Sequence, residues 1–433
     1  MRSLLVTPHT PWPQLGGAAI RMANVARGLA QLGDVDVLVI ADGSFEERPI
    51  VPPDVPVERV EMIVASSPPP SRIERMSWLM WGRLPRHFLR RDYRKARLTY
   101  DLWRTEQYDV AWLHRIQSYV ALGRDVTAPA IVDLDDLEDY KARARLALEA
   151  ADQTREQLSI RARLRRFVST LEAKHDIRLL RNLHARIARS AAAVVVCHQA
   201  DQQRLGANNA HVIPNAYEYQ LEPVGRGTVQ RPPTLTFPGT LTYHPNADGA
   251  TYLVQEVLPL LRERIPDVRI RLVGNASDET QRLNDPPRVV VTGFVQDIRT
   301  ELARADVIVV PIRYGSGTRV KILEALAHRI PVVSTKAGAE GIDVTHGREI
   351  LLADGPEEFA EACARLLQNA ALRVRLMEDG HRLFLSKYRA DRVREMVAAL
   401  AARAGAGDLR RPSVGRPTRV GQNGFFRSGH RAT

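Results

Sequence analysis

Residues 311–342 read PIRYGSGTRVKILEALAHRIPVVSTKAGAEGI and contain the side chains best suited to hold a phosphorylated ligand. An apolar strand is followed by the small loop Gly315-Ser316-Gly317 and by a helix that we expect to begin at Thr318. A helix N-terminus presents free backbone N–H groups and a positive dipole end, and together they bind phosphate. Arg319 and Lys321, on the first turn, can add charge-assisted hydrogen bonds.

Glu324 lies on the same predicted helix. Its carboxylate could accept hydrogen bonds from both hydroxyls of a ribose. The same residues also fit a capped amphipathic helix with ordinary surface charges. The residues alone do not separate these two interpretations.

The elements that must position these side chains alternate between strand and helix. Apolar, β-branched runs predict a first series of strands at 3–7, 35–40, 108–114, 129–136, 191–197 and 210–215. A second series is predicted at 234–239, 268–274, 288–294, 306–312, 331–335 and 349–354. Helical periods separate many of them, for example at 18–33, 137–190 and 245–264. This alternation predicts an α/β fold with two doubly wound parallel sheets, and the Pro/Gly-rich residues 220–233 predict a linker between them.

Several candidate binding residues stand where a predicted strand ends, which is where ligands bind in open parallel sheets. His114 ends the strand 108–114, and Gly274 and the run Gly293-Phe294-Val295 follow two strands of the second series. Gly16 and Gly17 precede the first helix and could let the backbone approach a phosphate.

The stretch 311–342 resembles the donor-binding motif of retaining glycosyltransferases of the GT-B fold, family 4. The resemblance continues through most of the chain, in the family's order, with TPHTPWPQLGGAAIR, VIPNAYE, FPGTLTYHPNADGATYLVQEVLPLL, LVGN and VTGFVQDIRTELARADVIVVP. It implies two Rossmann-like domains that face each other across a cleft. It also implies transfer of a sugar from a nucleotide-sugar to an acceptor hydroxyl, with retention of configuration.

The resemblance also implies roles for single residues. The family's motif usually has two Glu residues. Glu324 matches the second, which binds the nucleotide ribose, and Ser316 stands at the position of the first, eight residues earlier. His114 would lie over the donor sugar, so we expect His114 and Ser316 to be the catalytic residues. The expected donor-binding residues are Gly16, Gly17, Gly274, Gly293, Phe294, Val295, Gly315, Gly317, Thr318, Arg319, Lys321 and Glu324.

The family usually neutralises the diphosphate with an Arg and a Lys just after the first strand of its nucleotide domain. Residues 239–244 here contain neither, so Arg319 and Lys321 are the best substitutes. Helix ends and basic residues hold the diphosphate in this fold, so we expect no metal and no cofactor. One of the carboxylates Asp133, Asp135 and Asp136 is accordingly interpreted as an acceptor-side or helix-capping group.

We predict four regions along the chain. Residues 1–218 form the acceptor-side domain and residues 219–385 the nucleotide-sugar-binding domain. Residues 386–404 form a helix that crosses back to the first domain. Residues 405–433 are rich in Gly, Arg and Pro and predict a disordered basic tail.

The net charge of +12 is regional rather than uniform. Residues 72–104 hold ten basic and three acidic residues, interleaved with Trp and Tyr. This composition suits a helix lying on an anionic membrane. The other interpretation is that the aromatic residues are core and the Arg residues a solvated rim. Nucleic acid is a third basic-patch partner, and the donor-site pattern argues against it.

Other function classes find little support. Two cysteines, Cys197 and Cys363, exclude a disulfide scaffold, and no apolar run is long enough to span a bilayer. The first residues lack the features of a signal peptide, so we expect a cytoplasmic protein, with peripheral contact at the inner face of the membrane. The expected acceptor is a sugar, a lipid-linked molecule or a small molecule, in polysaccharide or glycoconjugate biosynthesis. The alternatives are a nucleotide-sugar 2-epimerase of the same fold and a non-catalytic scaffold.

Overall fold

The computed structural model describes residues 1–14, 16–41, 51–53, 55–65, 69–104, 107–152, 160–225, 228–229, 232–314 and 319–409. Two of our predictions fall largely outside these residues. They concern the loop and helix start at Gly315, Ser316, Gly317 and Thr318, and the basic tail 405–433, of which only residues 405–409 are described.

The first sheet contains, among the described residues, seven parallel strands in the order β3-β2-β1-β4-β5-β6-β7. The strands are β1 (Ser3–Thr7), β2 (Val35–Ala41), β3 (Val57–Val64), β4 (Val110–His114), β5 (Ala130–Asp135), β6 (Ala193–Val196) and β7 (Ala210–Val212). We did not predict β3. Within the described ranges it is an edge strand that pairs only with β2, so its sequence VERVEMIV keeps polar residues and lacks the apolar run of the central strands.

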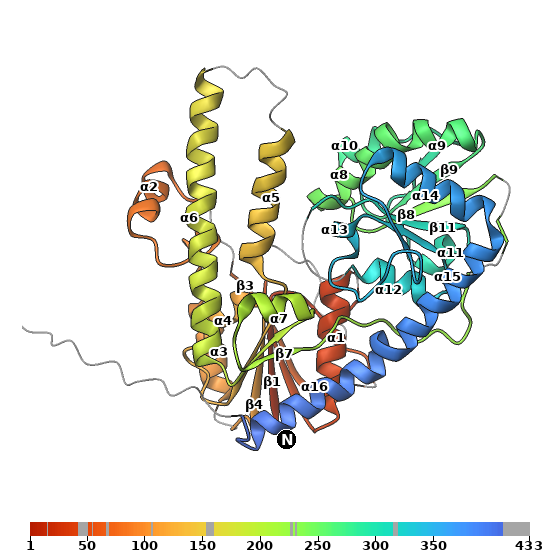
Figure 1. Cartoon of the computed structure of the whole chain (residues 1–433). Coiled ribbons are helices and arrows are strands. Elements are labelled where there is room, and N and C mark those ends of the chain that lie inside the picture. Colours follow the sequence, from red (N-terminus) through yellow and green to blue (C-terminus); the bar gives the residue numbers. More distant parts are fainter. Residues whose placement is uncertain are drawn as a thin grey trace, which may run out of the picture.

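Helices cover both faces of this sheet (Figure 1). They are α1 (Gly17–Ala30), α2 (Arg72–Trp81), α3 (Arg94–Trp103), α4 (Arg115–Leu122), α5 (Glu138–Asp152), α6 (Ile160–Ser190) and α7 (Gln199–Leu205), with a 3-10 turn η1 (Arg86–Phe88). The predicted helical stretch 137–190 is therefore two helices, α5 and α6, which pack together and extend beyond the sheet (Figure 1). None of the helices in the described part of the chain is long and apolar enough to cross a membrane.

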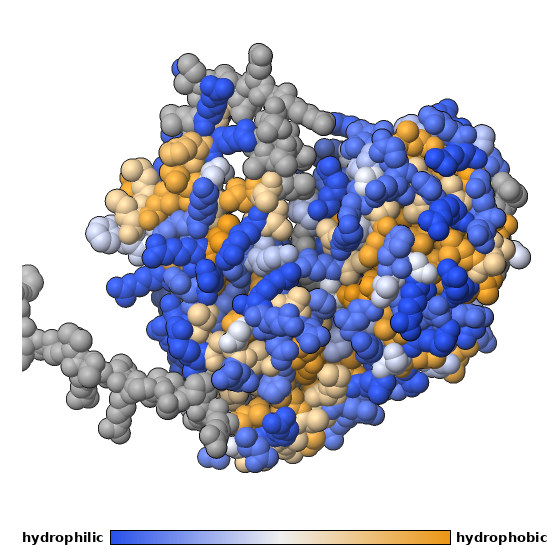
Figure 2. All heavy atoms as spheres, viewed as in Figure 1, coloured by the Kyte–Doolittle hydropathy of each residue, from blue (hydrophilic) through white to orange (hydrophobic). Residues whose placement is uncertain are grey.

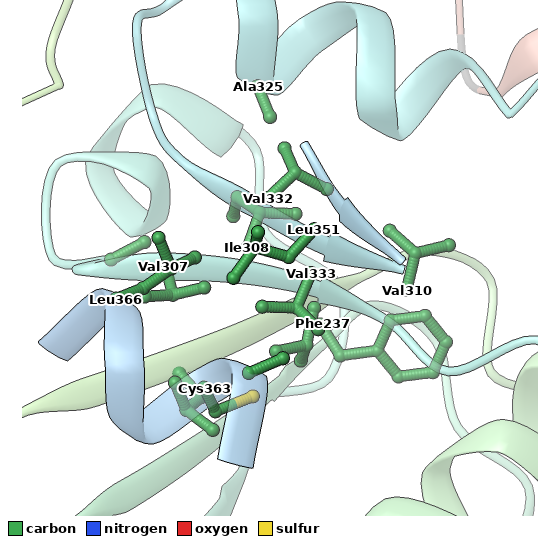
Figure 3. Packing of buried hydrophobic residues seen from close by; sticks show 14 of the residues in the cluster. Phe237, Val307, Ile308, Val310, Ala325, Val332, Val333, Leu351, Cys363 and Leu366 are labelled. Atoms are coloured by element: carbon green, nitrogen blue, oxygen red, sulfur yellow. The ribbon is translucent and has the colours of Figure 1, made fainter. Parts of the chain in front are cut away.

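The second sheet has six parallel strands within the described ranges, in the order β10-β9-β8-β11-β12-β13. They are β8 (Thr234–Pro238), β9 (Arg269–Val273), β10 (Val289–Val291), β11 (Val307–Val310), β12 (Val332–Ser334) and β13 (Leu351–Leu352). Figure 3 shows Phe237, Val310 and Val333 packed at the centre of this domain, with Cys363 and Leu366 covering them from a helix. Such apolar strands, covered on both faces, are typical of parallel sheets.

The helices of the second half are α8 (His244–Tyr252), the π turn η3 (Leu253–Val257), α9 (Leu258–Arg264), α10 (Asp278–Gln281), α11 (Ile298–Leu302), α12 (Val320–Ala327), α13 (Lys336–Ala339), α14 (Pro356–Gln368), α15 (Ala370–Leu383), the π turn η4 (Phe384–Tyr388) and α16 (Ala390–Gly405). The predicted helix 245–264 is one continuous run of α8, η3 and α9.

The chain returns to the first domain at its end. α16 runs from the second domain and packs against α1 (Figure 1). The two helices are so close that a Cβ at Gly28 would lie 2.8 Å from the carbonyl oxygen of Arg394. The two connecting segments also pair, because Tyr217 and Arg389 form a parallel bridge. The predicted fold class, two Rossmann-like parallel-sheet domains, is confirmed.

Candidate functional site

Three glycines form the carboxyl-terminal edge of the second sheet. Gly239, Gly274 and Gly293 follow β8, β9 and β10 and have φ angles of +146°, +132° and +70°. Gly274 donates its N–H to the carbonyl oxygen of Gly293 at 3.0 Å. A Cβ at Gly274 would lie 2.1 Å from the carbonyl oxygen of Gly239, so only glycine fits there. The side-chain space at Gly274 is therefore filled by the backbone of Gly239, whereas no described atom lies within 4 Å of a Cβ at Gly293.

The ammonium of Lys321 lies against this edge. Its Nζ is 4.3 Å from the centre of the Phe237 ring and 3.0 Å from Oδ1 of Asn246. A Cβ at Gly239 would lie only 2.6 Å from Nζ. The chain thus brings a cation from α12 to the end of β8, the place where residues 239–244 lack one. Burial, assisted by nearby Arg319, holds the pKa of Lys321 well below its usual value.

Glu324 lies one turn further along α12 and is mostly buried. Its Oε1 accepts a hydrogen bond of 2.8 Å from the hydroxyl of Tyr217, in the segment that connects the domains. Burial raises the pKa of Glu324 to about 7, although the Tyr217 hydrogen bond and Lys321 oppose the rise. This carboxyl therefore changes charge near neutral pH.

The N-termini of α1 and α12 meet at the boundary between the domains. A Cβ at Gly17 would lie 3.2 Å from Cγ2 of Val320, and each of these residues opens its helix. Gly16 caps α1 with a φ of +101°. Arg319 caps α12, and across the boundary it helps to lower the pKa of Asp136, whose burial acts in the opposite direction. Two positive helix ends and two cationic side chains therefore gather in one place, which suits a diphosphate.

His114 ends β4 and is fully buried. Its Nδ1 lies 3.7 Å from Oδ2 of Asp133, beyond hydrogen-bond length, and neither ring nitrogen has a partner among the described residues. Burial lowers the pKa of His114 against the opposing effect of Asp133, so the imidazole is neutral at pH 7. His9, which we did not single out from the sequence, lies close by, and burial with Arg115 and His114 lowers its pKa to about 3.

A buried ion pair holds α1 against the first sheet. The guanidinium of Arg21 donates to both oxygens of Asp133, at 2.8 and 2.9 Å, and also to Asn215 at 3.1 Å. Trp112 donates its indole N–H to Asp133 at 3.3 Å. Arg21, together with His114, holds the pKa of Asp133 well below its usual range despite its burial. Asp133 is therefore occupied by protein groups, and sequence reasoning missed its partner Arg21.

The other two carboxylates also have cationic partners. Asp135 lies 3.1 Å from Nη2 of Arg115, and Asp136 lies 3.2 Å from Nζ of Lys141. Arg115 and Asp135, at the ends of β4 and β5, have φ angles of +62° and +61°. Non-glycine residues seldom adopt this conformation, and such strain often clusters at functional sites. Among the residues that the structure describes, no group of His, Cys, Asp and Glu is arranged to hold a metal ion.

Of the remaining predicted residues, some lie at the edge of the second sheet and others lie outside the described residues. Phe294 is largely exposed and Val295 is half-buried, both just beyond Gly293 at the edge of the second sheet. Ser316 and its neighbours Gly315, Gly317 and Thr318 lie outside the described residues, so their predicted roles stay predictions.

The second domain resembles a known protein family. Residues 232–369 match the family model described as Glycosyl transferases group 1. Residues of this chain are 34% identical, over 129 residues, to D-inositol 3-phosphate glycosyltransferase from Pseudarthrobacter chlorophenolicus, covering 27% of this chain and 30% of that protein. They are 24% identical, over 134 residues, to an uncharacterized 44.6 kDa protein in the cps region of Klebsiella pneumoniae, covering 29% of this chain and 34% of that one. The chain spans about a third of the length of the curated relatives it matches.

Solved structures match nearly the whole chain. Sucrose-phosphate synthase from Thermosynechococcus elongatus has a TM-score of 0.66 at 16% identity, over 94% of this chain and 99% of that one. HepE from Anabaena, crystallised with UDP and glucose, has a TM-score of 0.58 at 18% identity, over 92% of this chain and 99% of that one. Residues 232–369 thus match the model of glycosyl transferases group 1, and the chain has the two-domain GT-B fold that these solved structures share.

Proposed function

We propose that this protein transfers a sugar from a nucleotide-sugar to an acceptor hydroxyl, with retention of anomeric configuration. The observation that carries the proposal is the meeting of the α1 and α12 N-termini at the domain boundary, beside Arg319 and Lys321. It supports a diphosphate held between the two domains. The match of residues 232–369 to glycosyl transferases group 1 and the UDP bound by HepE support a nucleotide-sugar as the donor.

Each candidate residue has a role in this proposal. Lys321 and Arg319 hold the diphosphate, the nucleoside lies at the ends of β9 and β10 beside the open Gly293, and Glu324 accepts the ribose hydroxyls. His114 is fully buried, so it would reach a sugar hydroxyl only when its surroundings open; its neutral imidazole would then donate a hydrogen bond without adding charge. Positioning and electrostatic stabilisation of the leaving phosphate then supply the catalysis, with the leaving phosphate taking the proton of the acceptor.

The proposal is tested by thermal unfolding with a panel of nucleotide-sugars. A ligand at 100 times its Kd adds about 2.7 kcal/mol to the free energy of unfolding, so one donor should raise the Tm clearly. Because Arg319, Lys321 and two helix ends supply positive charge, we expect the rise to persist in excess EDTA. A panel without any stabilising nucleotide-sugar would reject the proposal, and a rise lost in EDTA would reject its metal-free part.

Retention needs a separate measurement. With donor and acceptor present, proton NMR of the first product formed should show the anomeric configuration of the donor. An inverted product would refute retention. Consumption of the donor without acceptor, giving the 2-epimer, would instead favour the epimerase alternative.

We expect donor binding to strengthen as pH rises through 7. Glu324 has a pKa raised to about 7, and its ionised form accepts hydrogen bonds from the ribose with both oxygens and more strongly than the protonated form. Between pH 6 and pH 8 its ionised fraction, and with it the affinity for a nucleotide-sugar, should rise about tenfold. A nucleotide-sugar is the suitable probe because its diphosphate is a diester and does not titrate in this range. Calorimetric titrations at several pH values measure the change.

Glu324→Gln is the matched variant for this prediction. It keeps the shape of the side chain and a hydrogen bond from Tyr217, but it cannot ionise. Its affinity should be lower and should not show the rise between pH 6 and pH 8 that is expected for the parent. If the variant kept the pH dependence of the parent, the titrating group would be another residue.

A further inference from the structure

The first domain carries an apolar surface that faces away from its core. On α2, the side chains of Ile73, Met76, Met80 and Trp81 are between 64% and 80% exposed. On α6, Phe167, Val168 and Leu171 are also exposed. Figure 2 shows apolar residues gathered at the upper left, where Figure 1 places α2 beside α6. Monomeric proteins seldom leave such clusters in water, so the surface indicates a binding partner.

The opposite side of α2 fixes the helix to α6. Trp78 is buried, donates its indole N–H to Leu84 at 2.9 Å, and packs edge-on against His175 with ring centres 4.8 Å apart. Arg75 donates to the buried carboxylate of Glu172 at 2.9 Å. These contacts hold α2 in one orientation, so its apolar residues point outward because of how the helix packs and not because it is loosely attached.

The contacts also give the relative direction of the two helices. From Arg75–Glu172 to Trp78–His175, the contacts advance three residues along each helix, so α2 and α6 run parallel. Val168 then lies one turn before Glu172, at the level of the first turn of α2. We call the exposed apolar residues of α2 and α6 the α2–α6 surface.

Positive charge surrounds the α2–α6 surface. Arg72 and Arg83 flank α2, and Arg161, Arg163 and Arg165 lie on the first turns described for α6; all five are exposed. Within the described ranges, no carboxylate forms an ion pair with any of these five. The nearby Glu172 is already neutralised by Arg75 and Arg86. The partner should therefore combine negative charge with an apolar layer.

We propose that the α2–α6 surface docks the protein on an anionic lipid bilayer. The apolar side chains would enter the boundary between headgroups and acyl chains, and the arginines would contact anionic headgroups. A symmetric dimer through this surface would place the two arginine clusters opposite each other, which is unfavourable. The phosphates of a nucleic acid would neutralise the arginines, but they would leave the aliphatic stripe of α2 (Ile73, Met76 and Met80) without an apolar partner.

The structure changes which residues of 72–104 matter. Trp78, Phe88, Tyr93 and Tyr100 are buried, so the interpretation of these aromatics as core is correct. Three cations of the segment have local partners: Arg90 binds Glu74 at 3.0 Å, Arg94 binds Asp92 at 2.7 Å, and Arg91 donates to the carbonyl oxygen of Ala65 at 3.1 Å. The bilayer contact therefore rests on the α2–α6 surface rather than on the whole segment.

Sedimentation of the full chain with lipid vesicles tests the proposal. We expect binding to vesicles of equal parts phosphatidylglycerol and phosphatidylcholine, little binding to phosphatidylcholine alone, and release as salt rises. The triple variant Ile73→Ser, Met76→Ser, Met80→Ser removes the stripe, and the triple variant Arg72→Glu, Arg83→Glu, Arg163→Glu reverses the charge. Each should lower the partition coefficient about tenfold or more.

Matched controls lie elsewhere on the surface. Leu98→Ser with Leu102→Ser removes two exposed apolar residues of α3, and Lys95→Glu, Arg124→Glu, Arg282→Glu makes the same change in net charge. Both controls should bind vesicles like the parent. Circular dichroism and stabilisation by nucleotide-sugars should be unchanged in all variants, which separates this proposal from the proposed function.

Three results would overturn the bilayer proposal. The first is equal binding to neutral and anionic vesicles, or α2–α6 variants that bind as well as the parent. The second is a later elution of the stripe variant than the parent in gel filtration without lipid, because that would assign the surface to self-association. The third is a DNA duplex that binds the parent, but not the charge variant, at salt concentrations that release the vesicles.

Discussion

Replacing Arg21 with Met should lower the free energy of unfolding of the first domain by about 3–5 kcal/mol, because the change leaves the carboxylate of Asp133 buried without its cation. Both side chains are almost fully buried, and the pair forms two hydrogen bonds of 2.8 and 2.9 Å. Urea unfolding followed by tryptophan fluorescence measures the effect. The five tryptophans all lie between Trp12 and Trp112, so the signal reports on the first domain.

The pH dependence gives this prediction its sign. In the parent, the pKa of Asp133 is depressed, so its contribution to stability is present above the unfolded-state pKa and is lost as pH falls through the folded-state pKa. Without Arg21, burial should instead raise the pKa of Asp133. Protonation of Asp133 would then remove the buried charge and raise the free energy of unfolding of the variant as pH falls. The stability difference between parent and variant should therefore shrink from pH 7 towards pH 4.

Two further variants check the cause. Asp133→Asn in the Arg21→Met background removes the buried charge, so the double variant should be more stable at pH 7 than Arg21→Met alone. Arg104→Met removes an exposed cation that pairs with the exposed Asp101 at 3.1 Å, and it should cost no more than about 1 kcal/mol. A double variant less stable than the single one would show that packing, rather than the unpaired carboxylate, sets the loss.

The sheets were predictable from sequence because their strands are apolar runs of β-branched residues with little ambiguity. VDVLVI and DVIVVPI, for example, became β2 and β11. The edge strand β3 was missed because a strand with one neighbour and exposed positions does not need such a run. The helix α4 was missed because it follows β4 without a loop, beginning at Arg115 with a positive φ that no sequence pattern signals.

The candidate site was predictable only in part, for physical reasons. The position of His114 follows from the end of a strand, which sequence periodicity locates. The buried role of Arg21 does not, because arginine on a helix is usually exposed and its partner Asp133 stands 112 residues away. The exposure of Trp81 beside the burial of Trp78 likewise depends on where α6 packs, which no local pattern on α2 contains.

Replacing Lys321 with Met should weaken the binding of nucleoside diphosphates by tens of fold and leave nucleoside binding nearly unchanged. Lys321 is the cation at the end of β8, and a hydrogen bond to a charged group contributes roughly 1.5–3 kcal/mol. Methionine keeps the apolar packing over Phe237 and removes the charge together with the hydrogen bond to Asn246. Calorimetric titration with a diphosphate and with its nucleoside separates the two effects. Equal weakening of both ligands would mean that Lys321 shapes the nucleoside pocket instead.

Proton uptake provides an independent signature of the same contact. Burial and Arg319 hold the pKa of Lys321 well below its usual value, and a diphosphate beside Nζ would raise it again. Binding should therefore take up protons, seen as different heats in buffers of different ionisation enthalpy. Lys321→Met should lose this uptake. Lys336→Met, at an exposed lysine that pairs with Asp354 at 3.1 Å, should keep both the affinity and the uptake. Uptake that persists in Lys321→Met would place the titrating group, and with it the grip on the phosphates, on another residue.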